Sequence, residues 1–137
     1  MVQAQAQLSI DTRVRAAQSE QITTAAARIL AKDDEVDVRV VLATNESMCD
    51  PTVLSWLAKD ISPLVRESVA RHPEIDADEM ATDKDWRVRA SAGANRFTSP
   101  SVLIALLEDE EETVRECTRL NPSCPEPELQ VAEVAYS

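Results

Sequence analysis

The stretch Asp60-Ile61-Ser62-Pro63-Leu64-Val65-Arg66 decides the fold of this chain. It places an aspartate six residues before an arginine, with a valine directly before that arginine. The same arrangement recurs with the pairs Asp33 and Arg39, Asp83 and Arg89, and Asp109 and Arg115. A weaker version, which has Ser9 instead of the aspartate, ends at Val14-Arg15. A spacing that recurs in this way indicates one structural unit used several times.

The valines mark five copies of the unit and lie at positions 14, 38, 65, 88 and 114. Each copy is counted here from its aspartate, so copies are 23 to 27 residues long. Small or apolar residues follow each valine at helical spacing, which predicts five helices of about two turns that start near the valines. Seven residues after each valine stands a polar residue that is a plausible helix stop: Gln21, Asn45, His72, Asn95 and Asn121.

A second segment completes each copy and leads to the next aspartate. In three copies it opens with Pro51, Pro100 or Pro127, and proline at the first helical position is a start signal. The residues before these prolines, Asp50, Ser99 and Glu126, can cap a helix. In the third copy only ten residues separate His72 from Asp83, so we expect a turn or a 3₁₀ segment there. Residues 126–135 start another unit and stop, which predicts a terminal cap.

The pattern resembles two families of helical repeats. One part of the pattern is similar to HEAT-type repeats. It consists of an Asp, five intervening residues and the Arg of a Val-Arg pair that starts a helix. Val-Arg-x-x-x-Ala-x-Asn, followed by Pro-x-x-Leu-x-x-Leu-Ala-x-Asp, is more similar to the leucine-rich repeat variant family, and it covers the chain from about Ser9 to Ala135. The length of 137 residues predicts one domain over residues 1–137. The resemblance implies an all-α fold, a short right-handed α-solenoid of about five repeats. In it, an α-helix alternates with a shorter α or 3₁₀ segment.

One property of the variant-repeat family cannot be carried over. Its founding member has an iron–sulfur module made by an N-terminal cysteine cluster, whereas the first cysteine of this chain is Cys49. Cys49, Cys117 and Cys124 are an odd set without a close pair, which favours reduced thiols in a cytoplasmic protein.

The aspartates and arginines of the motif are predicted to form a structural ladder. Each aspartate is placed to accept backbone N–H groups at the start of a Val-Arg helix. Each arginine would pair with the aspartate of its own or the adjacent copy. The ladder then comprises Asp33, Asp60, Asp83 and Asp109 against Arg39, Arg66, Arg89 and Arg115. On this hypothesis Arg66→Ala strands Asp60 at a cost of about 2–4 kcal/mol. A row of arginines for phosphate is the alternative, which the paired acids and the negative charge disfavour.

Composition excludes several function classes. The formal charge of -11 makes direct binding to a nucleic acid improbable, because it repels a phosphate backbone. The longest apolar run, residues 102–107, is far too short for a membrane span. Residues 1–7 contain no Lys or Arg and no long apolar core, so no signal peptide is expected there.

No catalytic or metal-binding constellation is recognisable, and we expect a protein that is not an enzyme and uses no cofactor or metal. His72 is the only histidine, and it stands where other copies carry asparagine, which favours a helix-ending or loop-bonding role. A transition-metal site would require more histidines or a cysteine pair.

Residues that depart from the repeat are the candidates for binding a partner: Trp86, Arg96, Phe97 and His72. For Phe97 the favoured interpretation is that its ring covers the core beneath its loop, since most aromatic side chains are packed. The position of Trp86 is not uniformly apolar among the copies, so we expect its ring to be partly exposed. The chain is interpreted as a non-catalytic interaction module, an adaptor or scaffold, for a protein whose identity the sequence does not give.

The alternative function is an acidic mimic of nucleic acid that inhibits or regulates a DNA- or RNA-handling enzyme. It predicts that six carboxylates share one face: Asp76, Asp78, Glu79, Glu110, Glu111 and Glu112. A third possibility, a HEAT-like DNA glycosylase, is disfavoured by the negative charge, the small size and the absence of a basic cleft.

Overall fold

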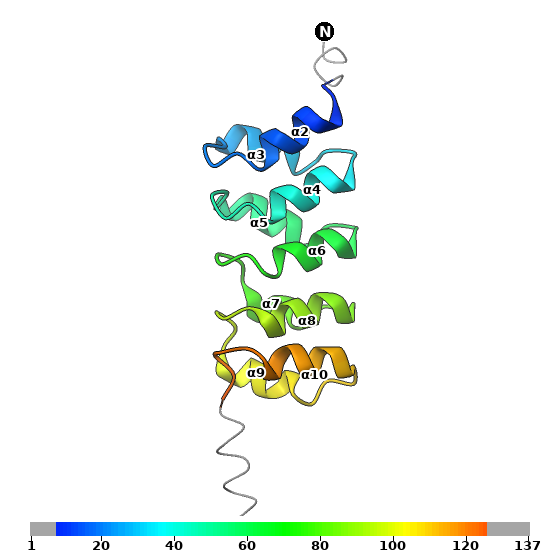
Figure 1. The fold of residues 1–137 in the computed structure, drawn as a ribbon, viewed down its shortest axis with the longest axis vertical. Helices are drawn as coiled ribbons and strands as arrows, with labels where there is room; N and C mark the ends of the chain where they lie inside the picture. The colour runs from blue at the N-terminus through cyan, green and yellow to red at the C-terminus, as the bar shows by residue number, and fades with distance from the viewer. Residues whose placement is uncertain (1–7, 126–137) are drawn as a thin grey trace, which may run out of the picture. The chain divides into compact units, whose positions relative to one another are not determined.

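A computed structural model describes residues 8–125, and within that range the chain forms nine α-helices and no strand (Figure 1). The all-α prediction is therefore confirmed for the described residues. By its internal contacts the chain divides after Ile75 into two compact units. Each unit is described by itself, and the assignment of residues 1–137 to one domain stays a prediction.

The first unit contains five helices that pack in sequence. They are α2 (Ile10–Ala17), α3 (Thr24–Leu30), α4 (Val36–Ala43), α5 (Pro51–Ala58) and α6 (Pro63–Val69). Helix α4 lies between α2 and α6 and contacts both, so these three Val-Arg helices form one row (Figure 1). Helices α3 and α5 form a second row, each packed against the two Val-Arg helices that flank it in sequence.

The second unit repeats this arrangement with four helices. They are α7 (Ala77–Met80), α8 (Trp86–Ala94), α9 (Pro100–Leu106) and α10 (Glu112–Arg119). The Val-Arg helices α8 and α10 pack against each other, while α7 contacts α8, and α9 contacts both α8 and α10.

The helix boundaries differ in detail from those expected. The Val-Arg helices of copies two to five begin two residues before the valine, because Glu35, Ser62, Asp85 and Glu111 are their N-cap residues. Pro51 and Pro100 occupy the first helical turn after Asp50 and Ser99, as predicted. The prediction of a turn or a 3₁₀ segment in the third copy is wrong. The segment is the four-residue α-helix α7, and Asp76 caps it by accepting the N–H of Glu79 at 3.2 Å. Glu126, Pro127 and the predicted cap 126–135 lie outside the described residues.

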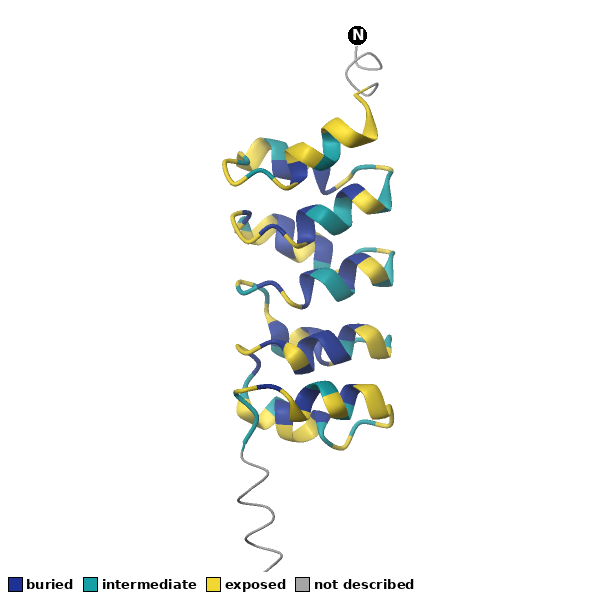
Figure 2. Ribbon diagram, viewed as in Figure 1, coloured by how far each residue is buried: buried dark blue, intermediate teal, exposed yellow. Residues whose placement is uncertain are grey.

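Aliphatic side chains fill the space between the two rows. In the first unit Val38, Val65 and Leu57 are fully buried, and in the second unit Val88 and Leu103 are (Figure 2). The valines of copies two to five are therefore core residues, and their burial supplies the main driving force for stacking. This explains how a chain with so few aromatic residues holds together.

Gly93, the only glycine of the chain, allows close packing of two Val-Arg helices. It lies inside α8 and faces the fully buried Thr118 of α10. A Cβ atom at position 93 would collide with the hydroxyl oxygen of Thr118. The glycine therefore serves the contact between helices and not a turn.

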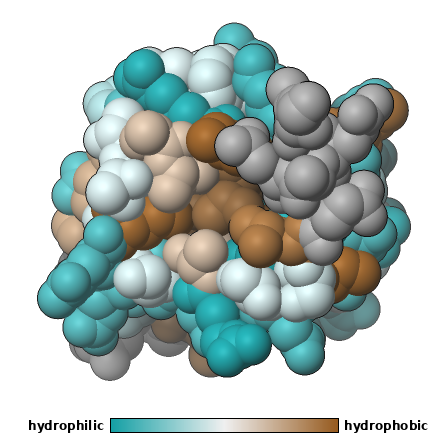
Figure 3. All heavy atoms as spheres, turned by 90° about the horizontal axis from the view of Figure 1, so that it is seen from above, coloured by the Kyte–Doolittle hydropathy of each residue, from teal (hydrophilic) through white to brown (hydrophobic). Residues whose placement is uncertain are grey.

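The first unit also has an apolar end, formed by α2 and α3. Leu8 and Ile10 are exposed there, and Val14 and Ile22 are half-buried. Figure 3 shows apolar residues in the middle of this end and polar residues around them. The partial exposure follows from position, since α2 has a Val-Arg neighbour on one side only among the helices of its unit.

Candidate functional site

Arg39 joins two successive turns of the first unit. Its Nε and Nη2 donate to the Asp60 carboxylate of the next copy, at 2.8 and 3.2 Å. Its Nη1 donates to the backbone carbonyl of Asp33 in its own copy, at 2.6 Å. A planar guanidinium suits this double task, because its donors point along fixed directions. Both side chains of the ion pair are largely buried.

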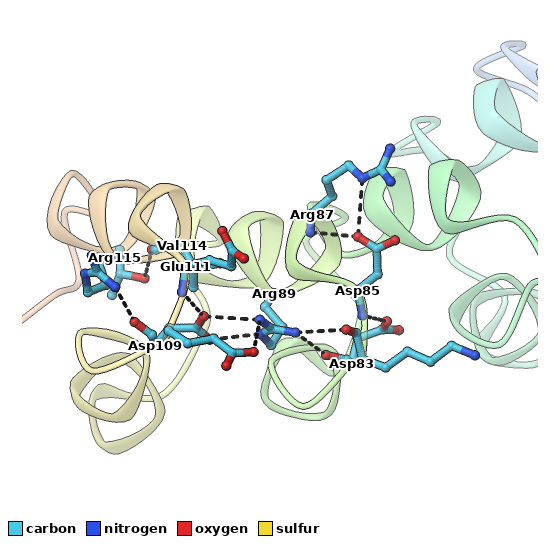
Figure 4. Close-up of polar contacts among 11 residues, drawn as sticks. Asp83, Asp85, Arg87, Arg89, Asp109, Glu111, Val114 and Arg115 are labelled. Atoms are coloured by element: carbon cyan, nitrogen blue, oxygen red, sulfur yellow. Dashed lines mark hydrogen bonds and ion pairs between the residues drawn. The ribbon is translucent and has the colours of Figure 1, made fainter.

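Arg89 makes the same contacts in the second unit (Figure 4). Its Nε and Nη2 lie 2.8 and 3.2 Å from the Asp109 carboxylate, and its Nη1 lies 3.0 Å from the carbonyl oxygen of Asp83. The hydrogen bonds from Arg89 lower the pKa of Asp109, although partial burial acts in the opposite direction. The same contacts raise the pKa of Arg89.

The aspartates also shape the turn in which they lie. Oδ1 of Asp60 accepts the N–H of Ser62 at 2.9 Å, and Oδ1 of Asp109 accepts that of Glu111 at 2.9 Å. Ser62 and Glu111 are the N-cap residues of their helices. Each aspartate therefore orders the turn that leads into the helix and does not itself cap the helix. The N-cap residue lies two positions after the aspartate that was predicted to bind the helix start.

The first copy uses a different arginine from the one that the valine spacing indicates. Arg13, not Arg15, pairs with Asp33, and its Nε lies 2.8 Å from Oδ2. Arg13 is the fourth residue of α2, as Arg39 is of α4. The register of the first copy is therefore shifted by two residues, so that Thr12, rather than Val14, corresponds to Val38.

Two further arginines bind the backbone of their own turn. Nη1 of Arg66 donates to the carbonyl of Asp60 at 2.8 Å, and Nη1 of Arg115 donates to that of Asp109 at 2.5 Å. Arg39, from the preceding copy, binds the carboxylate of Asp60. The hypothesis that Arg66→Ala strands the Asp60 carboxylate is therefore wrong, and Arg39→Ala is the substitution that removes its partner.

A second set of buried polar contacts ties the opposite ends of the Val-Arg helices. Nδ2 of Asn45 donates to the carbonyls of Ala17 and Ser19, both at 2.9 Å, and Oδ1 accepts the N–H of Ser47 at 2.9 Å. In the second unit Nδ2 of Asn121 donates to the carbonyls of Gly93 and Asn95, at 2.7 and 2.8 Å. The asparagines therefore do more than end a helix, because each amide also binds the loop of the preceding copy.

His72 takes the place of the asparagine in the third copy. Its Nδ1 accepts the N–H of Glu74 at 3.1 Å, and its Nε2 lies 3.0 Å from the carbonyl oxygen of Asn45. The two contacts together require the neutral imidazole with its proton on Nε2. Only 2% of the residue is exposed, so the prediction that His72 binds a partner is wrong. The geometry fits the loop-bonding role.

Phe97 and Arg96 lie together on an exposed loop of the second unit. Phe97 is 56% exposed, and the Cζ of Arg96 lies 4.9 Å from the centre of its ring. The expectation that Phe97 covers the core is wrong, since the next residue, Thr98, is the buried one. Asn95 accepts the N–H of Phe97 at 2.9 Å, and Ser123 donates to the carbonyl of Arg96 at 2.7 Å. Both hydrogen bonds therefore hold the peptide unit between Arg96 and Phe97, directly before the exposed ring.

Trp86 forms a separate exposed aromatic position. It is the first residue of α8 and is 38% exposed, with Cζ of Arg87 5.8 Å from its ring centre. Arg87 also contacts Asp85, the N-cap residue (Figure 4). Phe97 follows the other end of this nine-residue helix. A helix of that length spans roughly 13 Å, so the sequence-predicted residues do not form one site.

The six carboxylates that would form an acidic mimic have different environments. Asp78 accepts the N–H of Ser99 at 2.8 Å, and Asp76 caps α7. Glu110 lies near Arg89, and Glu111 is an N-cap residue. Asp76 precedes a second-row helix, whereas residues 110–112 lead into a Val-Arg helix, so the set is divided between two kinds of turn.

Several exposed apolar side chains of the first unit were not predicted from the sequence. Ile61, inside the motif that decides the fold, is 92% exposed, and Leu64 and Ile29 are exposed as well. A signal for Ile61 was present, because the other three copies that have the aspartate carry Asp34, Lys84 and Glu110 directly after it. An apolar residue at a position that is charged in those three copies indicates a surface departure from the repeat.

Within residues 8–125 no three side chains of the His, Cys, Asp or Glu type are grouped to hold a metal ion. No helix in that range is both long and apolar enough to cross a membrane. Burial raises the pKa of the Cys124 thiol, which disfavours its reactive thiolate.

No protein-family model, curated protein or solved structure matches this chain.

Proposed function

We propose that the chain is a non-catalytic helical-repeat module that binds a protein partner as an adaptor or scaffold. The proposed architecture is a short right-handed α-solenoid of the leucine-rich repeat variant or HEAT-like kind. The recurring Arg–Asp and Asn–carbonyl contacts within each unit support it, because they link successive copies in the same way. The three free cysteines fit a reducing compartment such as the cytoplasm.

The observation that carries the binding role is the exposed pair of Arg96 and Phe97. Aromatic and arginine side chains are both enriched in protein interfaces relative to the rest of the surface. Hydrogen bonds to Asn95 and Ser123 hold the loop in place, so little conformational entropy is lost when a partner binds. The other copies have Ser47, Glu74 and Ser123 at the position of Phe97, so the ring is not needed for the repeat itself.

A quantitative capture experiment from the source lysate tests this function. The wild type is compared with Phe97→Ser, which introduces the residue found in two other copies, and with Ile61→Ser as a control at another exposed apolar position. We expect one protein to be retained by the wild type and by Ile61→Ser, and to be lost with Phe97→Ser. Equal retention by Phe97→Ser would exclude the loop as the binding site.

The second candidate function, mimicry of nucleic acid, is favoured by one observation. Residues 76–137 carry 14 acidic and 6 basic side chains, and Glu108, Glu110, Glu111 and Glu112 are exposed around one turn. Capture of a basic nucleic-acid enzyme, lost at high salt and in a Glu110→Gln/Glu112→Gln variant, would support it. Capture that resists salt and depends on Phe97 would support the interaction module.

A further inference from the structure

The second-row helices of the first unit present a basic and apolar surface, defined here by Ile29, Lys32, Trp56 and Lys59. Ile29 is 73% exposed, and the indole of Trp56 is also partly exposed. Nζ of Lys32 lies 4.4 Å from the centre of the Trp56 ring, so the surface is continuous from α3 to α5. Lys32 and Lys59 occupy the same repeat position, directly before the turn aspartate of the next copy.

The corresponding surface of the second unit is acidic and apolar, and is defined here by Glu79, Ile104 and Glu108. Glu79 of α7 stands at the repeat position of Ile29 and Trp56, and Glu108 stands at that of the two lysines. Both glutamates are exposed, and Ile104 of α9 is half-exposed. Ile104 lies in the last turn of α9, and Glu108 follows two residues after the end of that helix.

Other charged side chains near these two surfaces form contacts within their own unit. Arg28 binds Asp50 through Nε at 2.9 Å, and Asp78 accepts the N–H of Ser99 at 2.8 Å. Arg28 and Asp78 occupy the same repeat position, and each ties its own helix to the start of the next second-row helix. The side chains of Lys59, Glu79 and Glu108 have no such contact among the described residues.

We propose that the basic surface of one copy of this chain binds the acidic surface of a second copy. Lys32 and Lys59 would face Glu79 and Glu108, while Ile29 and Trp56 would cover Ile104. Charge complementarity favours a second copy as the partner, because one chain carries both the basic and the acidic surface. The negative net charge opposes association only weakly at physiological salt, since charges further apart than about 8 Å are screened.

Charge-reversal variants and sedimentation velocity test the proposal. The wild type at about 10–500 µM should associate reversibly, as is usual for small contacts. Lys32→Glu/Lys59→Glu makes both surfaces acidic, and Glu79→Lys/Glu108→Lys makes both basic. Each variant alone should be monomeric, and an equimolar mixture should form mixed complexes. Circular dichroism checks that both variants are folded, which is expected for substitutions at exposed positions.

Three results would overturn the proposal: a monomeric wild type over that range, variants that associate as the wild type does, or a mixture that stays monomeric. If a charge variant fails to fold, Ile29→Ser provides a second test, and it should weaken association at least tenfold. Phe97→Ser should associate like the wild type. This control separates the self-association surface from the partner site proposed above.

Discussion

Arg39 and Asp60 lie 21 residues apart in the chain and are joined by two parallel hydrogen bonds, from Nε to Oδ2 at 2.8 Å and from Nη2 to Oδ1 at 3.2 Å. The third donor group of the same guanidinium binds the carbonyl of Asp33. One side chain therefore fixes the turn of its own copy and that of the following copy. A buried bidentate pair of this kind matters more for stability than an exposed ion pair.

Arg39→Ala should lower the free energy of unfolding by about 2–4 kcal/mol, because it leaves the 8%-exposed carboxylate of Asp60 without its cationic partner. Urea unfolding followed by circular dichroism measures the change. Arg39→Lys keeps the charge without the planar fork, so it should recover only part of the loss. A loss below about 1 kcal/mol for the alanine variant would contradict a structural role for the pair.

The register of the first copy is tested by a matched pair of substitutions. Arg13→Ala should lower the melting temperature by several degrees, because Arg13 binds Asp33. Arg15→Ala, two residues away on the same helix, should change it by less than about 2 °C, since Arg15 is exposed. If a thermal melt shows a larger loss for Arg15→Ala than for Arg13→Ala, the register indicated by the valine spacing is the correct one.

His72→Asn should be close to neutral, because an amide can replace both imidazole contacts: its oxygen accepts from Glu74 and its NH₂ donates to Asn45. His72→Ala removes both partners and should cost about 1–3 kcal/mol. Chemical denaturation of the two variants gives the comparison. Equal losses for both would show that ring packing, and not hydrogen bonding, is what position 72 needs.

Acid stability should depend on Asp109. Because hydrogen bonds from Arg89 hold the pKa of Asp109 below its ordinary value, the folded state favours the ionised form. The resulting stability is fully present above the pKa of the unfolded state and is lost as the pH falls through that of the folded state. Asp109→Asn should therefore be less stable than the wild type at neutral pH and should lose less stability on acidification.

The pH effect has a coupling control. In an Arg89→Gln background the hydrogen bonds that shift the pKa of Asp109 are altered, so Asp109→Asn should then change the acid dependence much less. Urea midpoints measured between neutral pH and about pH 3 provide the data. An unchanged acid dependence in the single variant would assign the stability of this turn to other groups.

Gly93→Ala should destabilise the chain by about 1–3 kcal/mol, because the added methyl group collides with the side chain of Thr118. Thr118→Ala in the same chain removes the collision and should restore part of the loss. The free energies of unfolding of both single variants and the double variant form a double-mutant cycle. Additive losses would mean that the two positions do not limit the approach of α8 and α10.

Much of the fold could be predicted because the motif valines must be buried. Their spacing located the Val-Arg helices of copies two to five, and the prolines located the starts of α5 and α9. The first copy was placed two residues too late, because it lacks the aspartate and the valine alone set the register. Arg13, the fourth residue of its helix, was the informative residue.

The direction of the arginine contacts could not be obtained from spacing. Each motif arginine follows an aspartate by six residues. Arg39 and Arg89 are also followed by a second aspartate, 21 and 20 residues later. Only the geometry shows that each of these two arginines binds the backbone carbonyl of the preceding aspartate and the carboxylate of the following one. Exposure was predicted correctly for Trp86 but not for Phe97 or His72, because a departure from the repeat does not reveal which way a side chain points.

The one-turn helix α7 shows where this chain tolerates a change in length. The third copy is shorter than the others, yet the turn at Asp83 and the nine-residue helix α8 that follow it are intact. The missing residues come from the second row, whose helices elsewhere have seven or eight residues. Deletions and insertions are therefore best accommodated between a loop asparagine and the next turn aspartate. That interval is the natural junction for recombining copies into longer or shorter arrays.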